Sequence, residues 1–163
     1  MSQLGEIALR VVAIGIGATV LFDGWLWAQQ RIGLPTMNFA LLGRWVGHLS
    51  NGTLSHPSIA NAAPVRGEMA IGWIAHYCIG IVFAALLLGL AGSTWVRSPT
   101  FGIALLVGMS TVVAPLFVLQ PAMGAGIAST KTPTPLRNCV RSLVNHTVFG
   151  IAMYAAAVVV SAL

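Results

Sequence analysis

The chain has 163 residues, of which 57% are hydrophobic and only 7% are charged, and its formal net charge is +5. Soluble domains carry roughly 25% charged residues, so this composition cannot build a water-covered surface and lipid must cover much of the protein. The basic residues are not clustered with aromatic side chains, which argues against a nucleic-acid interface. The length fits one domain and leaves no room for a soluble module beside four spans.

Four segments are long and apolar enough to cross the hydrocarbon region, which takes about 20 residues of helix. They are predicted at residues 7–27, 69–90, 101–119 and 142–161 of a single transmembrane domain that covers residues 1–163. None of them alternates polar with apolar residues, as the strands of a membrane barrel would. The sequence therefore predicts an all-α fold, an integral membrane four-helix bundle.

The first connection, residues 28–68, is long enough to hold a structure of its own. Asn38 can cap a helix at about 39–49, and the apolar side chains of that segment fall on one side. Arg44 and His48 lie one turn apart on it. This pattern predicts a short amphipathic helix lying in the membrane interface.

The basic residues are distributed unevenly between the connections. The other side of the membrane offers only Arg97, together with Arg10 near the start of the first span. Because cytoplasmic loops carry the excess of Lys and Arg, the first and third connections are placed in the cytoplasm. Both termini are then predicted in the periplasm of a bacterial inner membrane. The first and third connections hold the other six basic residues, Arg31, Arg44, Arg66, Lys131, Arg137 and Arg141.

A weak internal repeat links the second and fourth spans. Both contain His-x-x-x-Gly-Ile, beginning at His76 in one and at His146 in the other. Two helical hairpins of the same orientation would form a parallel repeat about an axis along the membrane normal. The two histidines are then expected to be pseudo-symmetry mates that point inward.

Ionisable groups inside a span cost about 2.5–3.5 kcal/mol at the helix centre, so they are functional candidates. Asp23, His76 and His146 lie inside spans, and Gln120 ends the third. The rise of about 1.5 Å per residue places them at similar depth, one to two turns from the cytoplasmic end. The sequence predicts a polar site there, with candidate ligand-binding residues Asp23, Arg44, His48, Glu68, His76, Gln120, Gly124, Gly126, Arg141 and His146.

Three interpretations of this site remain open. The first is the binding or transport of a small polar or anionic molecule, with free backbone amides around Gly124 and Gly126 and with Arg141 nearby. The second is a membrane redox or metal/haem protein in which His76 and His146 supply the ligands. The third is an interhelical hydrogen-bond network without a ligand.

No Ser/His/Asp spacing and no pair of carboxylates indicates a catalytic centre, so an enzymatic role is disfavoured and no catalytic residue is assigned. The sequence names no cofactor. The expected partners are the lipid bilayer and a small-molecule ligand. Four helices are few for a transporter, so a homo-oligomer is expected if transport is right.

Five short stretches carry a family resemblance over nearly the whole chain. Together they resemble a bacterial family of small four-span membrane proteins known only as a domain of unknown function. The resemblance implies an inner-membrane location and no assigned activity. The stretches are Gly43-Arg-Trp-Val-Gly-His48, Gly72-Trp-Ile-Ala-His-Tyr77, Gln120-Pro-Ala-Met-Gly-Ala-Gly126, Thr132-Pro-Thr-Pro135 and His146-Thr-Val-Phe-Gly150.

Overall fold

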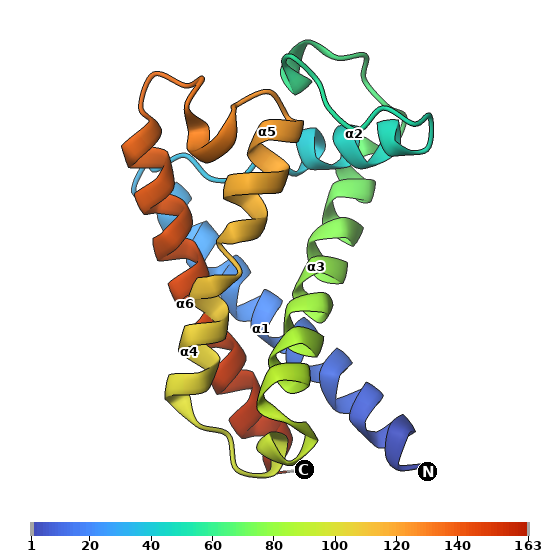
Figure 1. The fold of residues 1–163 in the computed structure, drawn as a ribbon, viewed down its shortest axis with the longest axis vertical. Helices are drawn as coiled ribbons and strands as arrows, with labels where there is room; N and C mark the ends of the chain where they lie inside the picture. Colours follow the sequence, from blue (N-terminus) through green and yellow to red (C-terminus); the bar gives the residue numbers. More distant parts are fainter. Residues whose placement is uncertain (1, 163) are drawn as a thin grey trace. The chain divides into compact units, whose positions relative to one another are not determined.

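The computed structural model describes residues 2–162, which form helices joined by turns and contain no β-strand (Figure 1). Within these residues four helical segments are long and apolar enough to cross a membrane. They are α1 (Gln3–Arg31), α3 (Glu68–Ala91), an interrupted helix over Phe101–Ala122, and α6 (Pro135–Ser161). The prediction of an all-α fold with four long apolar helices is confirmed, and the chain is a multi-pass membrane protein.

Two of these helices extend well beyond the predicted spans. The predicted segment 7–27 lies inside α1 and the predicted segment 142–161 lies inside α6. Hydropathy marks only the apolar part of each helix, whereas the backbone continues through polar flanks such as Gln3-Leu-Gly-Glu6. The Ser2 hydroxyl caps the start of α1 by accepting a hydrogen bond from the Gly5 amide.

The third membrane segment is broken near its middle. Helix α4 (Phe101–Ser110) ends before a turn at residues 111–112, and the chain continues as the π-helix η3 (Pro115–Leu119) and the short α5 (Gln120–Ala122). Pro115 explains the break, because proline has no N–H to donate and its ring crowds the carbonyl four residues earlier. The sequence predicted an uninterrupted span at 101–119.

The chain divides into two compact units, which are described separately. Unit 1 comprises Met1–Thr36, Tyr77–Thr111 and Asn145–Leu163, and unit 2 comprises Met37–His76 and Val112–Val144. Helices α3 and α6 each contribute residues to both units. The prediction of a single transmembrane domain stays a prediction.

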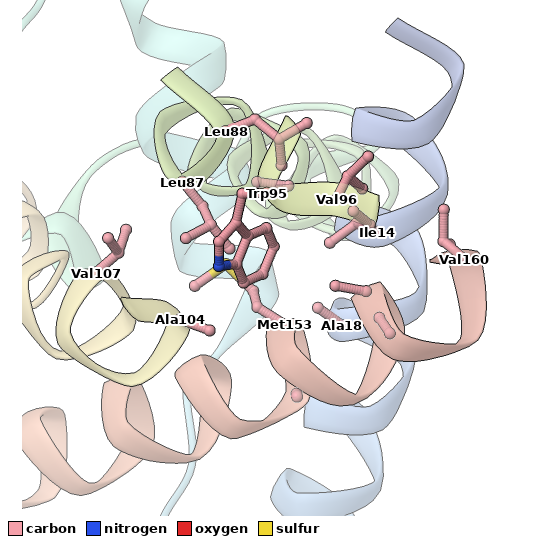
Figure 2. Close-up of a cluster of buried hydrophobic side chains, with 14 of the residues drawn as sticks. Ile14, Ala18, Leu87, Leu88, Trp95, Val96, Ala104, Val107, Met153 and Val160 are labelled. Carbon is pink, nitrogen blue, oxygen red and sulfur yellow. The ribbon is translucent and has the colours of Figure 1, made fainter. Parts of the chain in front are cut away.

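Unit 1 contains a dense apolar core built from α1, α3, α4 and α6 (Figure 2). Ile14, Leu87 and Met153 are fully buried there. Trp95, from the 3-10 helix η2 (Ser93–Arg97), lies in the same cluster and donates its indole N–H to the Thr100 hydroxyl at 3.0 Å. Many other large apolar side chains of this unit are exposed, as expected for surfaces that face lipid.

Glycines bring the helices of unit 1 into close contact. A Cβ atom on Gly15 of α1 would collide with the backbone of Ile81, and one on Gly108 of α4 would collide with the backbone of Gly150. Small residues allow such close backbone approach between membrane helices. Gly80 and Gly150, the glycines of the two His-x-x-x-Gly-Ile motifs, both lie at a helix contact, and the internal repeat itself stays a prediction.

Unit 2 contains α2 (Phe39–Leu49), whose bounds agree with the predicted helix. The Asn38 side chain accepts a hydrogen bond from the Ala40 amide at 3.0 Å, as the predicted cap requires. A Cβ on Gly43 or on Gly72 would collide with backbone of the other helix, so α2 packs directly on the first turns of α3. Its position in a membrane interface stays a prediction.

We expect Gly108→Ala to lower the free energy of unfolding by about 1–3 kcal/mol, because the new methyl group would force two backbones apart. Gly102→Ala on the same helix is the matched control, since its Cβ would meet no atom within 4 Å. Equilibrium unfolding in mixed micelles measures both. Equal effects of the two substitutions would contradict the glycine-mediated contact.

Candidate functional site

In unit 1, Asp23 connects α1 to α3. The Tyr77 hydroxyl donates a hydrogen bond to the Asp23 carboxylate at 2.9 Å. A carboxylate inside a membrane helix is costly unless protein or water solvates it, and this phenol supplies part of that solvation. Asp23 was a predicted site residue, whereas Tyr77 was not.

Asn145 connects α1 to α6 in the same unit. Its side-chain oxygen accepts one hydrogen bond from the Trp25 indole and another from the Gln29 amide, each at 2.9 Å. Gln29 is almost completely buried. Two donors on one acceptor fix the rotation of both helices at this level.

His146 connects α6 to α4 in unit 1. Its Nδ1 lies 2.7 Å from the Thr111 hydroxyl oxygen, and that hydroxyl donates its single proton to the Gly108 carbonyl. This arrangement is satisfied when the histidine carries its proton on Nδ1 and donates it to Thr111. The ring edge also packs against Phe83. The prediction that this histidine points toward other helices is confirmed.

These contacts satisfy the intramembrane polar groups of unit 1 inside the protein. Across residues 2–162, no buried side-chain nitrogen or oxygen lacks a hydrogen-bond partner. Asp23 and His146 therefore take part in interhelical hydrogen bonds, as the third interpretation of the sequence requires.

Arg44 is the centre of a dense set of contacts in unit 2. Its guanidinium binds both carboxylate oxygens of Glu68 at 2.9 Å. The remaining nitrogen donates to the carbonyls of Ile59, Ala60 and Ala62 at 3.1–3.3 Å. The hydrogen bond to Glu68 raises the pKa of Arg44, so this side chain remains charged while it holds the first connection against α2.

His48 and Glu68 were both predicted as ligand-binding residues. Glu68 is occupied by Arg44 and also accepts a hydrogen bond from the Val65 amide at 3.1 Å. His48 contacts His56, with 3.2 Å between His48 Nδ1 and His56 Nε2. The sequence did not indicate this contact.

His76 is a buried aromatic neighbour in unit 2, with 9% of its surface exposed. Its ring lies against Phe39 of α2, 4.8 Å between centroids, and against Trp73, 5.9 Å away. The expectation that it faces other protein elements is confirmed. His146 belongs to unit 1, so ligation of one metal or haem by these two histidines stays a prediction.

Gln120 lies at the centre of a polar cluster in the third connection. The Ser129 hydroxyl donates to the Gln120 side-chain oxygen at 3.0 Å, and the Gln120 amide donates to Ser142 at 3.4 Å. Ser129 is buried, and it and Ala128 both adopt left-handed backbone conformations, with φ of 60° and 50°. Such conformations are uncommon for residues other than glycine and recur at functional sites.

The backbone around Gly124 does not offer the free amides that the sequence suggested. The amides of Met123, Gly124 and Ala125 donate to carbonyls of residues 119–121 at 2.9, 3.1 and 2.8 Å. Positive φ angles of 95° at Gly124 and 77° at Gly126 allow this tight reversal. The expected row of free amides is therefore wrong over these three residues, because local turns use the donors.

The first connection caps the end of the third membrane segment. The amide of His56 donates to the Ala122 carbonyl at 2.8 Å, and the amide of Ile59 donates to the Met123 carbonyl at 3.1 Å. These carbonyls follow the helix end and would otherwise need water or another donor. The two long connections of unit 2 thus form one folded structure.

Arg141 makes no ion pair in the described part of the chain. Two ion pairs occur there, Arg10–Glu6 and Arg44–Glu68. Three other basic residues of the same unit, Arg66, Lys131 and Arg137, also make no ion pair within the described residues. Among residues 2–162, no three His, Cys, Asp or Glu side chains come close enough together to form a metal site.

The family comparison agrees with the sequence motifs. The model of a family described as "Protein of unknown function (DUF2938)" matches residues 12–160. The chain belongs to this family. Comparisons with curated proteins and with solved structures found no match. The family description carries no activity, so any function must come from the residues themselves.

Sequence reasoning missed several partners of the predicted residues. Asn145 was detectable, because an amide inside an apolar span follows the same rule as Asp23. Tyr77 and Thr111 were not, because their roles depend on how each helix is rotated. His56 is eight residues from His48 with a turn between them, a spacing that indicates no contact by itself.

We expect Tyr77→Phe to lower the free energy of unfolding by about 0.6 kcal/mol and by no more than about 1.7 kcal/mol, the mean and the maximum measured for hydrogen bonds between membrane helices. The substitution removes the hydroxyl that binds Asp23 and keeps the ring. Tyr154→Phe is the control, because the ring of Tyr154 packs edge-on against Phe101 and survives the change. If Tyr77→Phe were as stable as wild type, the hydrogen bond would contribute nothing to the fold.

Proposed function

We propose that this protein spans the bacterial inner membrane as a four-helix bundle with both termini in the periplasm. The distribution of basic residues supports this orientation, because six of the eight belong to the first and third connections. The exposed apolar side chains along the four long helices support contact with lipid over most of their length.

We also propose that unit 2 binds or transports a small anionic molecule. The observation that carries this proposal is its charge: five basic side chains share the unit with one carboxylate, and Arg44 already binds that carboxylate. Arg66, Lys131, Arg137 and Arg141 are left without an ion pair in the described residues. Basic side chains in one folded unit attract anions over distances of about 10 Å at 0.1 M salt.

The third connection fixes part of this basic surface. The Lys131 amide donates to the Ala125 carbonyl at 2.9 Å, and its side-chain stem lies beside Gly126. Arg137 and Arg141 lie one turn apart on α6. Arg137 also lines an open surface hollow of about 480 Å³ together with Thr134, Pro135, Leu136 and Val140. The accessible lining of this hollow is almost entirely apolar, so the support for anion binding comes from the charge of the unit and not from the hollow.

The intramembrane polar residues of unit 1 are assigned a different role. Asp23 and His146 each bind a side chain on a neighbouring helix, and this favours helix registration over ligand contact. The proposal therefore moves the ligand contact from Asp23, His76 and His146 to the basic residues of unit 2. If the protein transports its ligand, four helices per chain make a homo-oligomer the expected assembly.

The orientation is tested with reporter fusions. We expect a C-terminal alkaline phosphatase fusion to be active and a C-terminal green fluorescent protein fusion to be dark, because the first needs the periplasm and the second needs the cytoplasm. A fusion within residues 91–100, between α3 and α4, should behave in the same way. The opposite pattern at the C-terminus would overturn the proposed topology.

Anion binding is tested with inorganic phosphate and with vesicles. We expect phosphate to raise the thermal midpoint of the purified protein above the effect of equal ionic strength of chloride. The triple variant Lys131→Gln, Arg137→Gln, Arg141→Gln should lose this shift, whereas Arg31→Gln with Arg97→Gln, both outside unit 2, should keep it.

The same experiment also distinguishes free phosphate from the phosphate of a lipid head group as the bound anion. If only vesicles containing phosphatidylglycerol bind in a way that depends on the three residues, the anion is a lipid head group. If neither phosphate nor these vesicles distinguish the triple variant from the control, the anion site in unit 2 is wrong.

A further inference from the structure

Two histidines of unit 2 face each other outside the long apolar helices. His48 lies on the last turn of α2, and His56 lies in the connection that follows it. The distance from His48 Nδ1 to His56 Nε2 is 3.2 Å, and the ring planes are tilted by 46°. Both residues are half-buried, so part of each remains accessible to solutes.

The backbone on both sides of the pair is held in place. The His56 amide donates to the Ala122 carbonyl at 2.8 Å, and the Trp45 indole donates to the Leu54 carbonyl at 2.9 Å. Arg44 fixes the carbonyls of residues 59–62 after the histidine. The two rings are therefore preorganised, which is the condition for a specific ligand site.

The separation of the two nitrogens fits a tetrahedral metal ion. Zinc binds imidazole nitrogen at about 2.0–2.1 Å, so two such ligands at the tetrahedral angle lie roughly 3.3–3.4 Å apart. The observed 3.2 Å agrees within the usual tolerance of about 0.2 Å. A direct hydrogen bond between the rings is also possible at this distance, and it leaves the same two nitrogens facing each other.

We propose that His48 Nδ1 and His56 Nε2 form a binding site for a first-row transition metal ion of the zinc class. Metal binding uses both rings as neutral imidazoles, with the His48 proton on Nε2 and the His56 proton on Nδ1. Arg44 and Glu68 neutralise each other beside the pair, so the guanidinium does not repel the cation. The site is independent of the proposed anion surface.

The site provides two protein ligands. No third His, Cys, Asp or Glu joins the pair within the described residues. Water molecules must complete the coordination, which distinguishes this site from a closed structural zinc site with four protein ligands. Such a site exchanges its ion readily and keeps open positions.

The test uses the full-length protein in detergent, purified with a tag that contains no histidine. After equilibrium dialysis against buffer of defined Zn²⁺ concentration, elemental analysis of the protein and buffer chambers should find one bound equivalent per wild-type chain. His48→Gln and His56→Gln should each lose at least most of this metal, and His146→Gln should keep it. Size-exclusion chromatography and circular dichroism check that each variant is folded.

Electron paramagnetic resonance with Cu²⁺ gives a second readout, which reports the nature of the ligands and not only the amount of metal bound. The wild-type spectrum should show two equatorial nitrogen ligands, and the spectrum of either single variant should show one or none. Absence of saturable metal in the wild type would overturn the proposal, and so would unchanged binding in His48→Gln. Loss of the metal in His146→Gln alone would place the site at that histidine instead.

Discussion

The hydrocarbon interior of a membrane contains no water to solvate a polar group, and this constraint shapes unit 1. Every polar side chain placed in a span must find its partner on another helix or on its own backbone. Asp23 is hydrogen-bonded to Tyr77, and His146 is hydrogen-bonded to Thr111. Asn145 accepts hydrogen bonds from Trp25 and Gln29. Each of these pairs fixes the rotation of two helices, which glycines then allow to approach closely.

Unit 2 satisfies its polar groups in another way. Its long connections are mostly not helical, so their backbone groups must find hydrogen-bond partners outside a helix. Arg44 binds a carboxylate and three carbonyls, and the amides of His56 and Ile59 close the end of the third membrane segment. The result is a folded unit that contains five basic side chains, one carboxylate and a pair of facing histidines.

The parts of this account that depend on composition and period could be predicted from the sequence. Runs of apolar residues define the four long helices, and Asn38 with an apolar face defines α2. The cost of burying Asp23 and the two histidines in a span also identified residues that now have defined contacts. These inferences need only local sequence, because hydropathy and capping act within one helix.

The parts that depend on helix rotation or on loop folding could not be predicted. Tyr77 and Thr111 sit among apolar residues, and only the packing of neighbouring helices turns their hydroxyls toward Asp23 and His146. The amides near Gly124 were expected to be free, but a local reversal uses them. The contact of His48 with His56 depends on how the segment between them folds, which no short motif encodes.

In the proposed function, unit 1 holds the helices together and unit 2 contacts the ligand. Hydrogen–deuterium exchange of the protein in nanodiscs, with and without phosphate, tests this division directly. We expect slower exchange in the presence of phosphate within residues 37–76 and 112–144, and no change around Asp23 and His146. Protection that appeared instead around those two residues would contradict it.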